Sequence, residues 1–412
     1  MTTPLAEEAA IRAPARLSIL FFTVFVDLVG FGIVLPLLPL YADGFGASGA
    51  AVGLLVTSYS VAQFFMAPLW GRLSDRFGRR PIIIIGLVGS AVAYLVFAWS
   101  RSLTWLFASR ILAGIGGSTV PVAEAYIADI TPPEKRAGNM GLIGAAFGLG
   151  FIVGPATGGI LATVSFEAPG FAAAGLCFAN AVVAWFLLGE TLPQDRRRAP
   201  RRPSFRYSMD GLGRAFQSTE LRHVLALYFL FTVAFAVIQP TLSLFGQTRF
   251  GLDNRQVGYL FAFLGLVSAI VQGGLVRRLV PRFGEVRLVR FSGIPFVAGL
   301  ILLGLAPSIP VLLGAIALLA IGYGGALPPV LGLVSRVSPP ELQGGVLGVG
   351  QSVGSLARIV GPGMAGLAFD VGVAMPYLLG ASVAALATVL AAGMRPGFGL
   401  AASPTVDLGV TP

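Results

Sequence analysis

The chain has 412 residues, of which 56% are hydrophobic and only 11% are charged, and its mean hydropathy is +0.85. Soluble domains carry roughly a quarter charged residues, so this composition excludes an ordinary soluble protein. The net charge of +10 does not indicate nucleic-acid binding, because the arginines gather in short loops and not on a polar face with interleaved aromatic residues.

Apolar runs follow one another along the chain, each near the ~17–25 residues that a membrane-spanning helix needs. They lie at residues 17–41, 51–70, 82–99, 104–127, 138–164, 168–189, 222–247, 255–276, 287–306, 309–334, 344–369 and 372–394. We therefore predict an all-α membrane protein with twelve spanning helices in two six-helix bundles. The predicted divisions are an N-terminus at 1–16, a first bundle at 17–189, a linker at 190–221, a second bundle at 222–394 and a tail at 395–412.

The basic residues indicate an orientation. If both termini are cytoplasmic, nearly all Lys and Arg residues fall on the inner side, and the outer loops carry only Arg101, Arg249 and Arg255. Cytoplasmic loops are enriched in Lys and Arg, so we predict that the N-terminus, the linker and the tail are cytoplasmic. The first run contains an acid and has no small-residue cleavage site, and we interpret it as a retained helix and not as a signal peptide.

The first run contains the acid Asp27, which is followed by Gly30, Gly32, Pro36 and Pro39. An ionised carboxylate in hydrocarbon is costly, so an intramembrane acid is by default a functional residue. Asp27 lies about ten residues, or ~15 Å, from the inner end, near the middle of the membrane. We interpret it as a candidate proton carrier; the alternative is a structural residue hydrogen-bonded to a neighbouring helix.

The loop between the second and third runs, residues 71–81, reads GRLSDRFGRRP. We expect Gly71 and Gly78 to form tight turns and Asp75 to cap a helix or to meet an arginine. The alternative, a simple basic anchor, explains the arginines but not Asp75 or the glycine spacing. The predicted gating residues are Gly71, Asp75, Arg76, Gly78, Arg79 and Arg80, with Asp129 at the end of the fourth run as their partner.

The fourth run carries two charged residues, Arg110 and Glu124. Because a guanidinium keeps its proton, Arg110 needs an anionic partner such as Asp27, or water; the alternative is an arginine that reaches the outer interface. Glu124 follows after fourteen residues, which places both on one face of an unbroken helix ~21 Å apart. Glu124 is either a second protonation site or part of an inner ion network with Arg76 or Arg136.

The fifth run is rich in regularly spaced glycines: Gly141, Gly150, Gly154, Pro155, Gly158 and Gly159. Small residues at every fourth position let helices approach closely, and a proline removes a backbone donor and bends the helix. The alternative is the general glycine packing of membrane helices.

The two halves of the chain are related in sequence. The residues TPPE at 131–134 and IVGP at 152–155 recur as SPPE at 338–341 and IVGP at 359–362, with a constant offset of 207 residues. The loop at 71–81 has a weaker copy at 278–284, with Pro281 in the place of Asp75. Arg358 in the eleventh run corresponds to Phe151, so the repeat does not explain it. Arg358 either binds an anionic group of a substrate, pairs with Asp27 or makes a structural ion pair.

These motifs resemble those of the major facilitator superfamily. Residues 71–80 match its loop signature G-x-x-x-D-R-x-G-R-R, and residues 141–159 match the glycine pattern of its antiporters, G-x8-G-x3-G-P-x2-G-G. The first run from Asp27 to Tyr41 is similar to that of tetracycline-efflux-like drug:proton antiporters. The resemblance extends to about Met394. It implies two bundles that rock about a central cavity, a loop aspartate and arginines that hold one gating state by contacts between the halves, and a role of Arg110 in proton coupling.

From these features we expect a proton-coupled secondary transporter in a bacterial cytoplasmic membrane that exports drugs or related lipophilic molecules. The alternatives are a tetracycline-specific exporter and a sugar or metabolite symporter; a non-transporting scaffold is disfavoured. The expected partners are a small-molecule substrate, protons and the lipid bilayer, with no nucleic acid, and a monomer is expected to function. We expect no enzyme activity, cofactor or metal site, because the chain has no G-x-x-x-x-G-K-[ST] motif, one cysteine (Cys177) and one histidine (His223).

Overall fold

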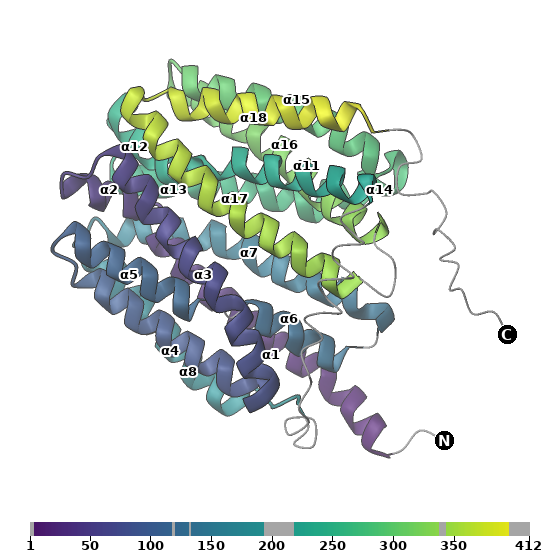
Figure 1. Ribbon diagram of the computed structural model, residues 1–412. Coiled ribbons are helices and arrows are strands. Elements are labelled where there is room, and N and C mark those ends of the chain that lie inside the picture. Colours follow the sequence, from purple (N-terminus) through teal and green to yellow (C-terminus); the bar gives the residue numbers. More distant parts are fainter. Residues whose placement is uncertain (1–3, 118–119, 132, 193–217, 338–342, 395–412) are drawn as a thin grey trace.

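The computed structural model describes residues 4–117, 120–131, 133–192, 218–337 and 343–394, which form helices joined by short turns (Figure 1). The first half, residues 4–192, comprises α1 (Pro4–Val34), α2 (Leu37–Gly44), α3 (Gly49–Phe77), α4 (Arg79–Ala98), α5 (Leu103–Gly116), α6 (Val120–Ile130), α7 (Pro133–Leu161) and α8 (Ala168–Leu187). The second half, residues 218–394, comprises α11 (Thr219–Ala236), α12 (Ile238–Phe250), α13 (Asn254–Ile270), the π-helix η1 (Val271–Val276), α14 (Arg277–Phe283), α15 (Glu285–Leu305), α16 (Ile309–Val337), α17 (Gln343–Val371) and α18 (Met375–Ala392). Most of the predicted linker and the whole tail lie outside the described residues.

The helices coincide with the predicted apolar runs. Within the described residues, eleven helical stretches are long and apolar enough to cross a membrane, from Arg16–Gly44 to Met375–Ala392. The remaining run is α17, which has 29 residues but is not among the eleven. Its apolar residues are interrupted by polar ones: Gln351, Ser352, Ser355 and Arg358. The prediction of an all-α membrane protein is confirmed.

Some of the spanning stretches are broken helices. The first is divided into α1 and α2 at Pro36, whose missing N–H ends the α1 hydrogen-bond ladder and suits the start of a new helix. In the fourth run, α5 and α6 lie on either side of residues 118–119, which are outside the described part of the chain. The common helix face of Arg110 and Glu124 therefore stays a prediction.

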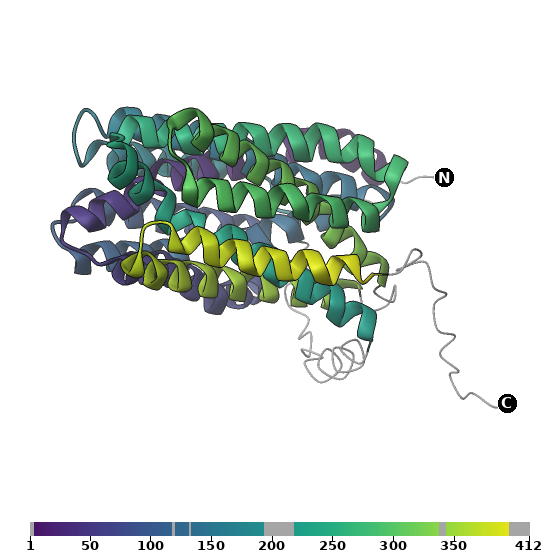
Figure 2. The same cartoon turned by 90° about the horizontal axis from the view of Figure 1, so that it is seen from above.

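The two halves lie side by side, with α1 beginning and α18 ending at the same end of the molecule (Figures 1 and 2). We call this the termini end and the other the opposite end. The most extensive contacts between the halves are those of α3 with α17 and of α7 with α13. At the first pair a Cβ on Gly49 would stand 2.7 Å from the Gly366 carbonyl oxygen, and at the second a Cβ on Gly265 would stand 2.6 Å from that of Phe151. Both pairs therefore need glycine at the contact.

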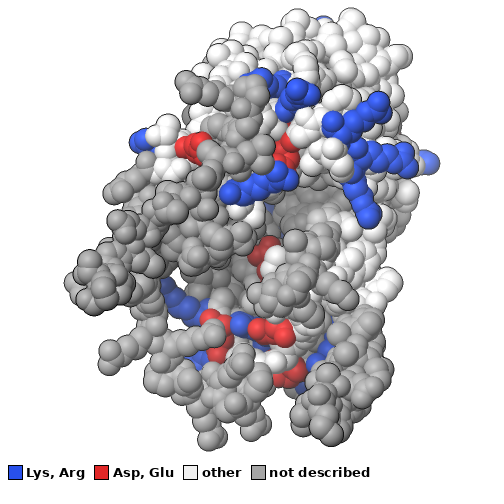
Figure 3. Space-filling model, turned by 90° about the vertical axis from the view of Figure 1, so that its right-hand side faces the viewer, with Lys and Arg blue, Asp and Glu red and all other residues white. Residues whose placement is uncertain are grey.

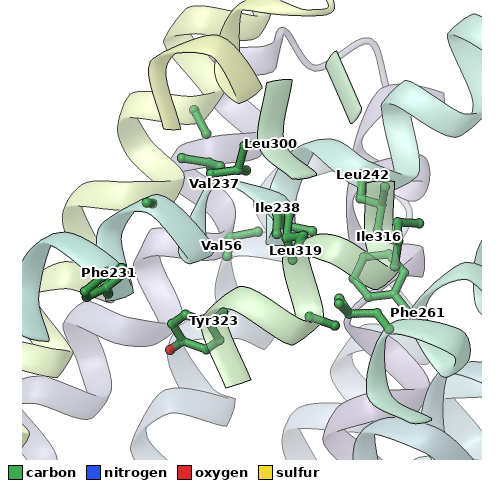
Figure 4. Packing of buried hydrophobic residues seen from close by; sticks show 14 of the residues in the cluster. Val56, Phe231, Val237, Ile238, Leu242, Phe261, Leu300, Ile316, Leu319 and Tyr323 are labelled. Atoms are coloured by element: carbon green, nitrogen blue, oxygen red, sulfur yellow. The ribbon is translucent and has the colours of Figure 1, made fainter. Parts of the chain in front are cut away.

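Buried apolar side chains fill both halves and continue across the boundary between them. One cluster includes Val56 of α3 together with Ile238, Leu242, Leu319 and other residues of the second half (Figure 4). A second cluster, around Tyr126, lies within the first half. Because packed interiors shift between discrete arrangements and do not deform continuously, each half is suited to move as a unit.

The loop at 71–81 folds differently from the prediction. Gly71 lies inside α3, which continues to Phe77, so the tight turn predicted at Gly71 is wrong. The turn is made at Gly78 alone, whose φ of 107° favours glycine. Gly284 occupies the corresponding position between α14 and α15 with a φ of 78°. The repeat in the sequence therefore preserves this one turn.

Candidate functional site

The central acid Asp27 lies on α1 and is half-buried. The thiol of Cys177 on α8 donates a weak hydrogen bond to its Oδ1 at 3.8 Å. One turn away, Asn180 Nδ2 donates to the carbonyl oxygen of Thr23 at 2.8 Å and holds α8 against α1. Asp27 thus has the neighbouring-helix partner that its structural interpretation requires. A thiol is a weak donor, so this contact alone satisfies little of the hydrogen-bonding capacity of the carboxylate.

A small cavity of about 30 Å³, lined by Phe31 four residues after Asp27 on α1, lies between the two halves. We call it the apex cavity. Its lining residues are Phe31, Leu35, Leu38, Val56, Tyr59, Ser60, Arg110, Gln239 and Arg358. The first seven belong to the first half, and Gln239 and Arg358 belong to α12 and α17 of the second. Any group held there contacts both halves at once, as a transport site must.

Arg110 is buried, with 2% of its surface exposed. Its guanidinium lies over the rings of Tyr94 and Phe97, at 5.9 and 5.6 Å from their centres. Its Nε donates to Ser109 Oγ at 3.4 Å, and one terminal nitrogen (Nη2) has no hydrogen-bond partner. The alternative of an arginine that reaches the outer interface is therefore excluded. Arg110 instead lines the apex cavity and carries one buried donor without a hydrogen-bond partner.

Arg358 approaches the same cavity from the second half. It is half-buried, and its Nη2 donates to Ser355 Oγ at 3.1 Å. The hydroxyl of Tyr59 lies within electrostatic range of Asp27, Arg110 and Arg358. The structure thus brings together three of the residues that the sequence marked as coupling residues, around a tyrosine that the sequence analysis did not identify.

Glu124 lies apart from this group, on α6. Its Oε1 accepts a hydrogen bond from Gln351 Nε2 of α17 at 3.5 Å. The predicted ion network had Arg76 or Arg136 as partners of Glu124. The partner in the structure is an amide from the other half, and the Arg136 side chain lies outside the described part of the chain.

The predicted gating loop forms an ion network at the termini end. Arg79 contacts Asp75 at 2.6 Å and Asp129 at 3.1 Å. Its Nη1 also donates to Ser74 Oγ at 2.6 Å. Arg79 is buried, while Asp75 is exposed. Asp129 meets the loop through this arginine, and these groups all belong to the first half.

Glu190 completes this network, and the sequence analysis missed it. Its carboxylate accepts hydrogen bonds from the backbone N–H groups of Arg79 and Arg80, at 3.0 and 3.3 Å. A carboxylate at a helix N-terminus satisfies free N–H groups and opposes the positive end of the dipole. Arg80 donates to the Trp185 carbonyl oxygen, and the Arg76 guanidinium lies 5.3 Å from the centre of the Phe77 ring. The loop signature thus fixes the ends of α3, α4, α6 and α8 relative to one another.

The glycine pattern of α7 is a packing surface. Cβ atoms on Gly150 and Gly154 would stand 2.8 and 2.7 Å from Leu28 and Gly32 of α1, and one on Gly158 would meet Ile33. Gly159 faces the second half instead, with the Asn254 carbonyl oxygen at 2.8 Å. The remaining members are Pro155, which lies inside the helix beside Gly32, and Gly141, whose surroundings are not described.

Polar contacts between the halves close the opposite end. Asp370, at the end of α17, accepts hydrogen bonds from the backbone N–H groups of Gly49 and Ala50, at 2.6 and 2.9 Å, and so caps α3 from the other half. Ser243 donates to the Pro36 carbonyl oxygen at 2.6 Å. At the termini end the surface between the halves is hollowed and arginines gather around it (Figure 3). Hydrogen bonds thus join the halves at the opposite end, and a hollow between the halves opens at the termini end.

Comparisons with known proteins agree with this architecture. A family model described as Major Facilitator Superfamily matches residues 20–362 and 276–403. The Tetracycline resistance protein, class C, of Escherichia coli is 34% identical over 354 residues, which cover 84% of this chain and 87% of that protein. Multidrug resistance protein 2 of Bacillus subtilis is 28% identical over 370 residues, which cover 87% of this chain and 90% of that protein. The crystal structure of the human organic anion transporter MFSD10 (TETRAN) matches 92% of this chain and 99% of its own with 28% identity and a TM-score of 0.71.

Proposed function

Because this chain belongs to the major facilitator superfamily, and is thus a multi-pass membrane transporter and not an enzyme, we propose that it exports drugs or related lipophilic small molecules in exchange for protons. The observation that carries the proposal is the position of Asp27, an acid in mid-span within electrostatic range of Tyr59, which lines a cavity shared by both halves. An intramembrane acid at such a place is suited to proton relay.

The orientation of the protein in the membrane follows from the basic residues. Arginines gather at the termini end (Figure 3), and cytoplasmic surfaces are enriched in Lys and Arg. We therefore assign the termini end to the cytoplasm and regard the structure as an inward-facing state. In a bacterium the membrane would be the cytoplasmic membrane. Both halves of a single chain line the apex cavity, so a monomer suffices for function.

The mechanism is alternating access with competition at Asp27. In the inward-facing state Asp27 releases its proton to the cytoplasm, and substrate enters through the hollow. The halves then rock, and Asp27 becomes accessible from the more acidic outside. Protonation there displaces the substrate and favours the return. Coupling requires that proton and substrate each bind the two states with different affinity. Glu124, which contacts Gln351 across the halves, is a second candidate for proton binding.

The relatives support export but differ in substrate. Two are tetracycline or multidrug resistance proteins, and one is an organic anion transporter. A tetracycline-specific exporter is the nearest alternative, and a symporter of the same fold is a more distant one. The apolar lining of the apex cavity, Phe31, Leu35, Leu38 and Val56, favours a lipophilic substrate over a sugar.

The test is transport by the purified protein in vesicles with an imposed pH gradient. We expect substrate accumulation to depend on the gradient, and Asp27→Asn to abolish that dependence. Asp43→Asn is the matched control, because it removes a carboxylate from an exposed turn at the opposite end. If Asp27→Asn transports as the unchanged protein does, Asp27 is not the proton carrier. If no substrate moves in response to a pH gradient, antiport is refuted.

A further inference from the structure

The apex cavity carries more positive than negative charge. Among the described residues, the charged groups that act on Tyr59 are the carboxylate of Asp27 and the guanidiniums of Arg110 and Arg358. Asp27 can balance one guanidinium, and the other remains. An arginine cannot lose its proton, and burying an unpaired charge costs several kcal/mol. Water in the cavity could satisfy a free N–H group but would not neutralise this charge.

Arg110 is the buried one of the two arginines that line the cavity. It is 2% exposed, it lines the cavity, and its Nη2 has no hydrogen-bond partner. Arg358 lines the cavity from the other half, and Gln239 and Ser60 add polar groups that can donate hydrogen bonds. This donor set is complementary to a carboxylate or an acidic enol, which arginine binds through paired hydrogen bonds.

The dimensions limit the cavity to one functional group. Its volume of about 30 Å³ exceeds the ~10–15 Å³ that a cavity needs to hold one water molecule, so it admits a small polar group and not a whole drug-sized molecule. Phe31, which lines it, follows Asp27 by four residues on α1, about one helical turn or ~6 Å. A drug-sized molecule extends well beyond this cavity. With one group in the cavity, it can place another group beside Asp27.

Antiport requires that protonation of Asp27 weakens substrate binding, and this requirement determines the charge of the group beside Asp27. A purely anionic substrate would bind more tightly when Asp27 is protonated, because the net positive charge then rises. Protons from outside would then retain the substrate and not release it. A cationic amine beside ionised Asp27 competes with the proton, as export requires. The site therefore needs an acidic group for its arginines and a basic group for its aspartate.

We propose that the apex cavity is a subsite for the acidic group of an amphoteric substrate, which Arg110 and Arg358 bind from the two halves, while the basic group of the same molecule meets Asp27. This assignment deepens the proposed function and rests on it. The acidic group joins both halves through the arginines, and the basic group alone exchanges with the proton. Substrates with both groups are preferred to lipophilic monocations and to simple organic anions.

Three related probes test the assignment: ciprofloxacin, which has an aryl carboxylate and a piperazine amine, its methyl ester, which keeps only the amine, and its N-acetyl derivative, which keeps only the carboxylate. Binding to the purified protein is measured by fluorescence titration without a pH gradient, and transport is measured in vesicles with one. We expect the parent to bind roughly tenfold more tightly than the ester, since a hydrogen bond to a charged group is lost. We expect the pH gradient to drive export of the parent but not of the N-acetyl derivative.

Substitutions separate the arginine subsite from general folding. Arg358→Gln should bring the parent-to-ester affinity ratio close to one, and Arg358→Lys should restore part of it. Arg249→Gln, in an exposed position at the opposite end, should keep the full ratio. If the ester binds as tightly as the parent, or if Arg358→Gln preserves the ratio, the subsite is refuted while gradient-driven export can stand. If the ratio follows Arg358 but no probe responds to the gradient, the subsite stands and proton antiport is refuted.

Discussion

Removal of the Asp370 carboxylate should open the opposite end of the transporter. This side chain caps α3 from the other half through two hydrogen bonds, of 2.6 and 2.9 Å, to the N–H groups of Gly49 and Ala50. Caps of this kind contribute about 1–2 kcal/mol, and partial exposure reduces the charged component. Since the bonds must break when the halves separate at this end, Asp370→Ala should raise the outward-open to inward-open ratio roughly 5- to 30-fold.

The change can be measured as a distance between the two halves. Spin labels at Asp43 and Arg249, both exposed at the opposite end, report separation in lipid nanodiscs by pulsed electron resonance. We expect a larger population at long distance in Asp370→Ala. Asp253→Ala is the matched control, because Asp253 caps α13 within its own half, with Gln256 N to Asp253 Oδ1 at 2.7 Å. Equal distance distributions in the Asp370 and Asp253 variants would refute the argument that the cap between halves biases the conformation.

Three further substitutions test the packing and the ion network. Gly78→Ala should lower the melting temperature measurably, because a positive φ costs a non-glycine residue roughly 1–2 kcal/mol and the new Cβ would meet Glu190. Gly71→Ala, inside α3 with open space around it, should leave the melting temperature unchanged. Gly154→Leu should prevent α1 from packing on α7 and abolish folded protein in size-exclusion chromatography, while Gly144→Leu, which has open space around it, should be tolerated. Glu190→Gln should cost about 1 kcal/mol through weaker capping of α4, seen as faster amide hydrogen exchange at its first turn; unchanged exchange would contradict the capping role.

Hydrophobic pattern alone sufficed to predict the helices, because a membrane span has a fixed length and needs an apolar surface. It did not predict the interruptions within spans. The break at Pro36 has a visible signal in the proline. The common helix face of Arg110 and Glu124 stays a prediction, because residues 118–119 between α5 and α6 lie outside the described part of the chain.

The candidate site was predictable where a charge lies in an apolar run, and Asp27, Arg110 and Arg358 were found by this signal. The sequence analysis missed residues whose roles depend only on the contacts that they make in the folded protein. Tyr59 is an ordinary aromatic residue in its run, and Asp370 lies near the end of a span where charges are common. Their roles arise from contacts between segments far apart in the sequence, such as Asp370 and Gly49 at a separation of 321 residues, and no local pattern encodes these.

The single thiol of the chain offers a spectroscopic readout that needs no substitution. Cys177 is buried and donates its hydrogen to Asp27 Oδ1 at 3.8 Å. The infrared stretching band of an S–H group lies in a window where other protein groups absorb little, and its frequency falls as the acceptor becomes stronger. Conversion of the carboxylate to a carboxylic acid weakens the acceptor, so titration of Asp27 should shift this band. The unmodified transporter thus contains a vibrational reporter of its own proton site.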